Sequence, residues 1–273
     1  MSHTFDLAAY LHRIGYDAPV KPDLSTLRAL VAAHVAAIPF ENLDPLLGVP
    51  VVLEPALIEK KLVQSGRGGY CFEQNALLRG VLSAIGFEVV GLIARVLWGR
   101  EEDAITAQSH MLLRIELEGA SWLVDVGFGG QTLTGALKLE ADTVQPSAHE
   151  PYRLIHADGV WRMQSLVRDT WSTLYRFDLQ PRYPIDYVVA NHYSSTYPES
   201  HFLHSLVVAR SVPGRRLALR NRDFVVHHLG GESVRRTLRD AAEIREVLGR
   251  EFLIRVPDHP LLDQRLDALP MPE

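Results

Sequence analysis

The sequence predicts an α+β fold in which helices come first and strands follow. Apolar residues recur at helical spacing up to about residue 86, and short Val-, Ile- and Leu-rich runs separated by turn residues follow from residue 88. This order favours α+β over a repeating βαβ sheet. With 273 residues, of which 47% are hydrophobic and 22% charged, the chain has the composition of a globular protein with a sizeable core.

Four helices are expected in the first part of the chain. Asp23 is a candidate N-cap for the second helix, Pro55 is a typical first-turn residue of the third, and Gly86 ends the fourth. The expected helices cover residues 5–14, 24–38, 55–64 and 71–85.

Strands dominate the remainder, with one further helix expected near residues 240–248. Glu118-Gly119-Ala120 is a candidate hairpin turn, and Asp158-Gly159 is a stronger one. The expected strands cover residues 88–98, 110–117, 122–126, 152–156, 160–164, 170–179, 203–211 and 224–228. Domain boundaries are expected near Gly86 and within residues 181–197.

Composition and charge exclude several classes of protein. A net charge of −5 and a single Cys argue against a general nucleic-acid binder and exclude an intramolecular disulfide. The sequence shows no signal peptide and no apolar run long enough for a membrane span, so a soluble cytoplasmic protein is expected. No His, Cys and acidic residues stand at metal-binding spacing, and no metal is expected.

Arginines are concentrated near the C-terminus. Residues 205–255 hold eleven Arg and six acidic residues. Such a run is either a solvated face or a site for an anionic group such as a phosphate.

The only Cys stands in the stretch Arg67-Gly68-Gly69-Tyr70-Cys71-Phe72, at the start of the fourth expected helix. A helix N-terminus favours an anion, and it is one of the environments that activate a thiol as a nucleophile. Its free N–H groups also suit the oxyanion of a tetrahedral intermediate. The alternative is an inert Cys in the core.

A nucleophilic Cys needs a base and a group that orients the base. His110 and Asp125 are the candidates, because each is a polar residue that interrupts an apolar strand. The alternatives are a satisfied core His and a turn or cap Asp. If Gly119-Ala120 form the turn, Asp125 lies opposite Arg114, four residues or roughly 13 Å from His110.

The chain resembles the arylamine N-acetyltransferase family over nearly its whole length. The resemblance rests on the Arg-Gly-Gly-aromatic-Cys stretch that ends at Cys71, followed by His110 and Asp125 in that order. Further matching segments cover residues 10–16, 38–43, 109–111, 124–129 and 191–198.

The resemblance implies a helical bundle at residues 1–86, a β-barrel-like domain at 87–190 and an α/β lid at 191–273, with a cysteine-protease-like catalytic core. It implies a triad of Cys71, His110 and Asp125, and a Glu41–Arg67 pair that holds the loop under the Cys. It also implies an acceptor pocket and contacts to acetyl-CoA, which acts as co-substrate and not as a bound cofactor. The implied pocket residues are Phe40 and Phe128, for which core packing is the alternative, and the implied CoA contacts are Ser109, Gly127 and Gly129.

The implied reaction is ping-pong acetyl transfer to an arylamine, arylhydrazine or hydrazide through an acetyl-Cys71 thioester, as in xenobiotic metabolism. Residues 210–222 are candidates for contacts to the CoA phosphates. Three rival functions are a cysteine hydrolase or transglutaminase-like enzyme, an amide synthase that releases a polyketide chain, and a CoA- or aromatic-binding protein. No nucleic-acid or membrane partner is expected, and the oligomeric state is left open.

Overall fold

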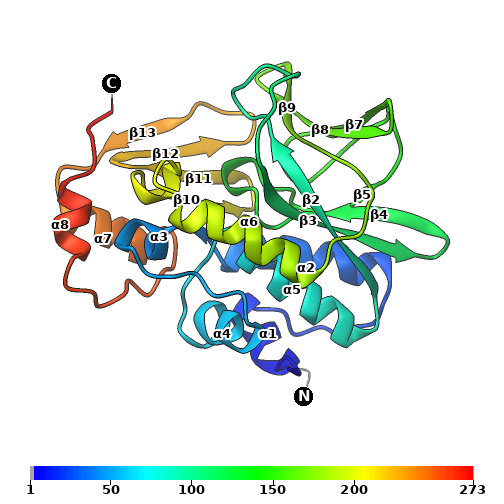
Figure 1. Cartoon of the computed structure of the whole chain (residues 1–273), viewed down its shortest axis with the longest axis horizontal. Coiled ribbons are helices and arrows are strands. Elements are labelled where there is room, and N and C mark those ends of the chain that lie inside the picture. Colours follow the sequence, from blue (N-terminus) through cyan, green and yellow to red (C-terminus); the bar gives the residue numbers. More distant parts are fainter. Residues whose placement is uncertain (1–2, 273) are drawn as a thin grey trace.

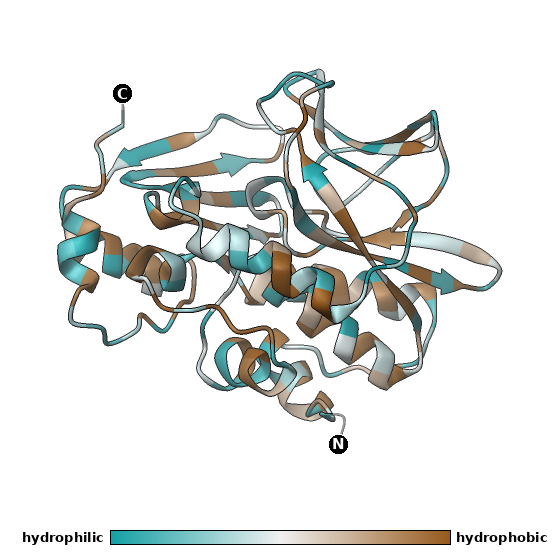
Figure 2. Cartoon of the chain, viewed as in Figure 1, coloured by the Kyte–Doolittle hydropathy of each residue, from teal (hydrophilic) through white to brown (hydrophobic). Residues whose placement is uncertain are grey.

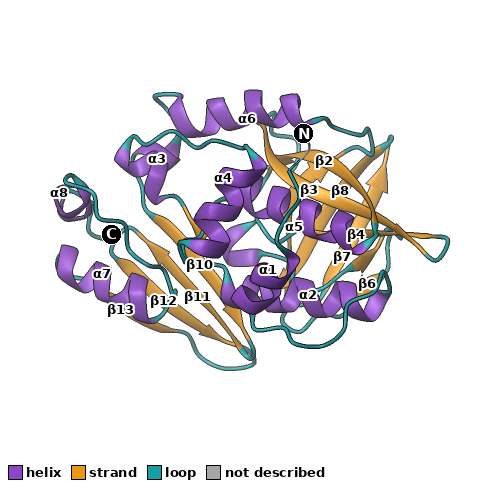
Figure 3. Ribbon diagram, turned by 90° about the horizontal axis from the view of Figure 1, so that it is seen from below, coloured by secondary structure: helices purple, strands orange, loops and turns teal. Residues whose placement is uncertain are grey.

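A layer of helices packs against two antiparallel sheets in the computed structural model, which describes residues 3–272 (Figures 1 and 3). The α+β class is therefore confirmed. α5 packs on the larger sheet, and α2 packs on the smaller one. The helices of this layer are α1 (Leu7–Ile14), α2 (Leu24–Ala37), α4 (Pro55–Glu59) and α5 (Cys71–Ile85). The short helix α3 (Leu43–Leu47) packs instead into the apolar cluster of the smaller sheet.

The helix boundaries follow from local chemistry. The side chain of Asp23 accepts a hydrogen bond from the Thr26 backbone N–H, which caps α2 as expected. Gly86 ends α5 in the left-handed conformation that glycine adopts without strain. The third expected helix is split, because α4 continues as one turn of π-helix at Lys60–Gln64.

The larger sheet has eight strands and curls into a barrel-like shape. Its order is β5-β4-β3-β2-β9-β8-β7-β6, and the side-chain amide of Gln145 in β6 bonds both the N–H (2.8 Å) and the carbonyl (2.9 Å) of Lys138 in β5. This amide therefore joins the two edge strands. The strands are β2 (Glu88–Val96), β3 (Gln108–Leu117), β4 (Ala120–Val124), β5 (Leu137–Lys138), β6 (Val144–Gln145), β7 (Tyr152–Ala157), β8 (Val160–Val167) and β9 (Thr170–Phe177).

The β3–β4 hairpin turns one residue earlier than predicted. Glu118 and Gly119 both have positive φ and form the turn, so Leu117 pairs with Ala120. The predicted pairing of Arg114 with Asp125 is therefore wrong, since Arg114 lies opposite Leu123.

The smaller sheet combines an early strand with late ones. β1 (Phe40–Glu41) pairs with β10, and the order continues as β11, β12 and β13. The expected strand at 203–211 begins later, because residues 201–203 form a 3₁₀ turn. These strands are β10 (Val207–Val212), β11 (Arg215–Arg220), β12 (Asp223–His228) and β13 (Val234–Thr237), and α7 (Ala241–Arg250) and α8 (Leu262–Asp267) follow.

The sequence did not predict the short helices α3 and α8 or the longer helix α6 (Pro184–Thr196). The residue pattern of α6 explains why this helix was missed. It buries polar residues such as Asn191 and Ser195, whereas Ile185 and Val189 are exposed. Figure 2 shows apolar bands along this helix. The expected boundary between residues 190 and 191 falls inside α6, and the three-part division stays a prediction.

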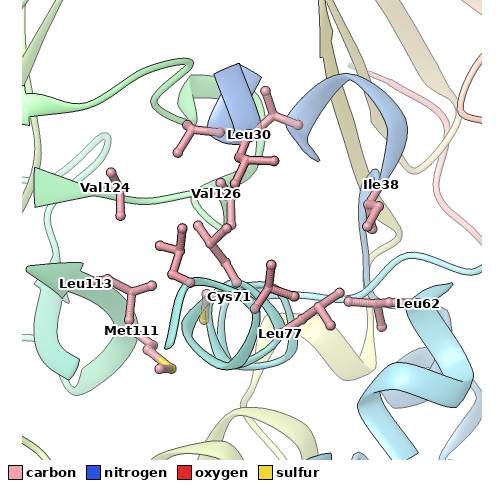
Figure 4. Close-up of a cluster of buried hydrophobic side chains, with 14 of the residues drawn as sticks. Leu30, Ile38, Leu62, Cys71, Leu77, Met111, Leu113, Val124 and Val126 are labelled. Atoms are coloured by element: carbon pink, nitrogen blue, oxygen red, sulfur yellow. The ribbon is translucent and has the colours of Figure 1, made fainter. Parts of the chain in front are cut away.

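Buried apolar side chains from several elements surround the start of α5. Figure 4 shows Cys71 there beside Leu77 of the same helix, Met111 of β3 and Val126. The nucleophile candidate therefore stands on a rigid, well-packed part of the fold. Within residues 3–272, no helix is both long and apolar enough to cross a membrane.

His34 of α2 is fully buried in the helical layer. Its Nδ1 lies 3.0 Å from the hydroxyl of Tyr10 and its Nε2 lies 2.7 Å from Oε1 of Gln74. Burial lowers the pKa of His34 to about 4, because charging the ring in this environment is costly.

This pKa predicts a pH dependence of stability. The unfolded chain binds a proton at His34 below about pH 6.5 and the folded chain only near pH 4, so this contribution is complete above pH 6.5 and is lost as the pH falls towards 4. We expect the loss to be about 3 kcal/mol between pH 7 and pH 4. Urea unfolding over this range should show a shallower decline in His34→Gln than in the wild type. An identical slope in both proteins would mean that His34 does not carry the effect.

Candidate active site

Cys71 is the first residue of α5, and two glycines permit the close approach of the loop before it. A Cβ on Gly68 would lie 2.1 Å from the Pro39 carbonyl oxygen, and a Cβ on Gly69 would lie 2.7 Å from a carboxylate oxygen of Glu73. The same oxygen, Oε2 of Glu73, accepts a hydrogen bond from the Tyr70 backbone N–H at 3.1 Å and so caps the helix. The side chain of Cys71 thus stands where the helix dipole favours an anion.

A β-bulge in β3 places His110 against Cys71. Ala94 pairs with His110 and Arg95 with Gln108, so Ser109 is the extra residue. The Ser109 carbonyl lies 3.5 Å from Sγ of Cys71. The bulge therefore brings the end of β3 onto the start of α5.

Asp125 reaches His110 although the two residues are not directly paired. Leu113 pairs with Val124, the last residue of β4, so the next residue, Asp125, lies opposite Leu112. His110 lies two residues from Leu112 in β3 and therefore on the same face of the sheet. Diagonal neighbours on one face are within reach of polar side chains. Oδ2 of Asp125 lies 2.7 Å from Nε2 of His110. The gap expected from the sequence is thus closed by the earlier turn and this diagonal contact.

Asn75 is a site residue that sequence reasoning did not single out. Its side-chain amide donates to the Met111 carbonyl at 2.8 Å and to Oδ1 of Asp125 at 3.1 Å. Its Oδ1 accepts from the Val126 N–H at 3.2 Å. Asn75 lies one helical turn after Cys71, and that spacing was the available signal.

The electrostatics of the pair favour a charged imidazole. Burial alone would lower the pKa of His110, but the carboxylate of Asp125 and the neighbouring Cys71 raise it to about 10. Burial would likewise raise the pKa of Asp125, and the attraction of His110 together with the Gly127 N–H and Asn75 lowers it. Because Nε2 faces Asp125, Nδ1 is the ring nitrogen that faces Cys71.

Aromatic rings surround the triad. The ring of Phe128 lies 5.2 Å from that of His110, the ring of Tyr175 lies 5.0 Å from that of His110, and the Phe128 and Tyr175 rings lie 5.3 Å from each other. Phe40 forms an isolated bridge with Gly69 and is 8% exposed. Phe202, which sequence reasoning missed, packs on Phe40 at 6.2 Å and on Tyr70 at 5.5 Å.

The three residues expected to contact CoA lie close to the triad. Ser109 is the bulged residue described above. A Cβ on Gly127 would lie 2.6 Å from Cα of Cys71, so this glycine permits the loop after β4 to contact α5. Gly129 has a φ of 81° and faces the ring of Phe40.

A network of buried charges holds the loop beneath Cys71. Arg67 pairs with Glu41 at 2.7 Å and with Asp44 at 2.8 Å, which confirms the expected Glu41–Arg67 contact. Lys61 joins Asp44 to Glu73, with 2.6 Å to each. Because each charge has a partner of opposite sign, the network tolerates burial.

Two arginines of the 210–222 run, Arg216 and Arg222, are held by partners within the protein. Arg216 is 2% exposed and is held by Glu150 at 2.7 Å and by Ser211 at 2.7 Å, so its donors are not available to a phosphate. Arg222 donates to the carbonyls of Leu269 and Asp267. The proposed role of this run in phosphate binding is therefore not supported for these two residues.

A cleft of about 640 Å³ lies between the larger sheet and the smaller one. Its walls come from the loop before β7, the β8–β9 turn and the β12–β13 turn. Its ionisable lining residues combine basic and acidic side chains: Arg168, Arg216, His149, His227, His228, Glu150 and Asp169. Gln131, which contributes to the wall, follows the Phe128 loop and so connects the cleft to the neighbourhood of the triad.

Comparison with known proteins identifies similar chains. The sequence profile of an N-acetyltransferase family matches residues 23–261. The chain is 46% identical to the arylamine N-acetyltransferase of Mycobacterium tuberculosis over 97% of its own length and 95% of that protein, and 40% identical to that of Escherichia coli over 91% and 89%. The structure of Mycobacterium marinum arylamine N-acetyltransferase in complex with CoA superposes with a TM-score of 0.93, at 42% identity and 97% and 99% coverage.

The His110–Asp125 bond predicts the behaviour of Asp125→Asn. An Asn side chain fits the same space, but it can donate to Nε2 and so stabilise the wrong tautomer of His110. We expect a folded protein whose rate of acyl transfer falls by at least about 100-fold. Circular dichroism and a steady-state assay at pH 7.5 check this. A folded variant with an undiminished rate would show that Asp125 has only a structural role.

Proposed function

This chain belongs to the arylamine N-acetyltransferase family, and on that premise we propose that it transfers the acetyl group of acetyl-CoA to aromatic amines, arylhydrazines and hydrazides. The observation that carries the proposal is the 2.7 Å contact of His110 with Asp125 beside a Cys71 that begins a helix. The single-site geometry supports a ping-pong sequence through an acetyl-Cys71 thioester.

The first half-reaction exchanges one thioester for another. The Cys71 thiolate, paired with protonated His110, attacks the carbonyl carbon of acetyl-CoA. N–H groups in the first turn of α5, which have no partner within the helix, suit the developing oxyanion. The bond from carbon to the CoA sulfur then breaks, and His110 gives its proton to the departing CoA thiolate, which leaves as a neutral thiol.

The second half-reaction forms an amide. The amine nitrogen attacks the acetyl carbon, neutral His110 takes the proton that the nitrogen loses, and the Cys71 thiolate leaves. Aromatic amines are weak bases and remain unprotonated near pH 7, so they are nucleophiles where aliphatic amines are ammonium ions. The step is favourable because an amide replaces a thioester.

Water must not compete with the amine for the acetyl group. Phe128 lies against His110, and Phe40 and Phe202 pack together beside the loop before Cys71. Such an apolar lining disfavours water and accepts a flat aromatic substrate. We assign Phe40 and Phe128 to the acceptor pocket, with Phe202 as a third wall. Ser109, Gly127 and Gly129 are assigned to the acetyl end of CoA.

We further assign the nucleotide end of CoA to the 640 Å³ cleft, because it is roomy, is lined by the Arg168 side chain and is adjacent to the Phe128 loop. A cytoplasmic location follows from the use of acetyl-CoA, an intracellular metabolite.

Trapping of the acyl-enzyme tests the proposed function. The protein is incubated with acetyl-CoA alone, and its intact mass and peptide map are recorded. We expect one acetyl group on Cys71, which an arylamine or arylhydrazine removes. Cys71→Ser should form no such adduct and retain far less than about a tenth of the turnover, because a hydroxyl does not ionise near pH 7.

Release of CoA without a lasting adduct would indicate a hydrolase. No adduct and no release would indicate another acyl donor or a binding protein, and either result would contradict the proposal.

The cleft assignment predicts an effect of Arg168→Glu on the donor. Reversal of this charge should raise the KM for acetyl-CoA about five- to tenfold and leave the KM for the amine nearly unchanged, and added salt should weaken the effect. Arg265→Glu on α8 is the matched control. Equal changes in both KM values would contradict the assignment.

A further inference from the structure

Three buried polar side chains beneath the site take no part in the proposed chemistry. Tyr10 of α1, His34 of α2 and Gln74 of α5 are all 0% exposed. They form a chain from the Tyr10 hydroxyl to Nδ1 of His34 at 3.0 Å and from Nε2 of His34 to Oε1 of Gln74 at 2.7 Å. Three helices are thus joined by one continuous set of hydrogen bonds.

The backbone carbonyls that accept from Gln74 fix the donor and the acceptor of each hydrogen bond in this series. The side-chain amide nitrogen of Gln74 lies 2.7 Å from the Pro39 carbonyl oxygen and 3.2 Å from that of Gly69, and carbonyls only accept. Gln74 must therefore present its oxygen to His34, and His34 must carry its proton on Nε2. Nδ1 is then an acceptor, so the Tyr10 hydroxyl donates.

The two carbonyls belong to the two segments that carry Phe40 and Cys71. Pro39 precedes Phe40 of the acceptor pocket, and Gly69 lies two residues before Cys71. The backbone bonds between these segments are few: Gly69 N–H to the Pro39 carbonyl at 3.4 Å and Glu41 N–H to the Gly69 carbonyl at 3.1 Å. The amide of Gln74 donates to the Pro39 and Gly69 carbonyls at once and so links the two segments through its side chain.

We propose that Gln74, oriented by His34 and Tyr10, is a positioning residue that fixes Phe40 relative to Cys71 and thereby sets the attack geometry of the acceptor amine. This inference rests on the proposed function. The acceptor step should be the more sensitive one, because Phe40 belongs to the acceptor pocket and small misplacements of a bound nucleophile reduce rates strongly. Acetylation by acetyl-CoA depends less on Phe40.

The test measures the two half-reactions separately. Acetylation is followed as CoA release on rapid mixing of enzyme with acetyl-CoA. The desalted acetyl-enzyme is then mixed with an arylamine, and loss of the acetyl group is followed by mass. Wild-type protein that fails to acetylate at all refutes the proposed function, and this outcome is distinct from any difference between variants.

Tyr10→Phe removes one hydroxyl and keeps the ring. We expect the acceptor step to slow about fivefold, which corresponds to about one hydrogen bond, while acetylation changes by less than about twofold. Tyr16→Phe is the matched control and should leave both steps unchanged. The Tyr16 ring packs on the same core but takes no part in the Tyr10–His34–Gln74 hydrogen bonds.

His34→Leu and His34→Gln separate hydrogen bonding from packing. Leu cannot donate to Gln74 and should slow the acceptor step more than Tyr10→Phe does. Gln retains a donor for Gln74 and an acceptor for Tyr10, and it should recover the rate to within about threefold of wild type. Equal slowing of both half-reactions, unchanged rates in Tyr10→Phe, or a folded His34→Gln as slow as His34→Leu would overturn the proposal.

Discussion

The buried contact between His110 and Asp125 is the interaction on which the site depends. Two ionisable groups that are 3% and 1% exposed are stable only if they are paired and their other polar atoms are bonded. Asn75 and the Gly127 N–H satisfy the second oxygen of Asp125, and Nδ1 of His110 is left to face Cys71. The protein therefore stabilises the charges of His110 and Asp125 in place of water, and the positive charge of the His110 ring lies beside Cys71.

Several parts of the fold serve this contact. α5 supplies Cys71 and Asn75 from one end, the bulge at Ser109 supplies His110, and the loop after β4 supplies Asp125. Glycines allow the backbones to approach, since a Cβ at Gly127 would overlap with α5. The charge network below and the aromatic rings above then restrict movement of the loop. The site is assembled from rigid elements, as preorganised catalysis requires.

The sequence predicted the helical layer, most of the barrel strands and the three catalytic candidates, because periodicity and end signals are local. It did not predict α6, which buries Asn191 and exposes Val189, so its pattern is the reverse of an ordinary amphipathic helix. A turn shifted by one residue misplaced Asp125, since register depends on which residues adopt positive φ. Asn75 and Phe202 were missed because their contacts are made between elements far apart in the chain.

The resting site holds His110 as an imidazolium between Asp125 and Cys71. ¹⁵N NMR of labelled protein at pH 8 tests it most directly, with Cys71→Ala to identify the effect of the thiolate on the His110 signal. The raised pKa of His110, about 10, predicts that both ring nitrogens are protonated at this pH in the wild type. A neutral ring with one unprotonated nitrogen at pH 8 would contradict the account.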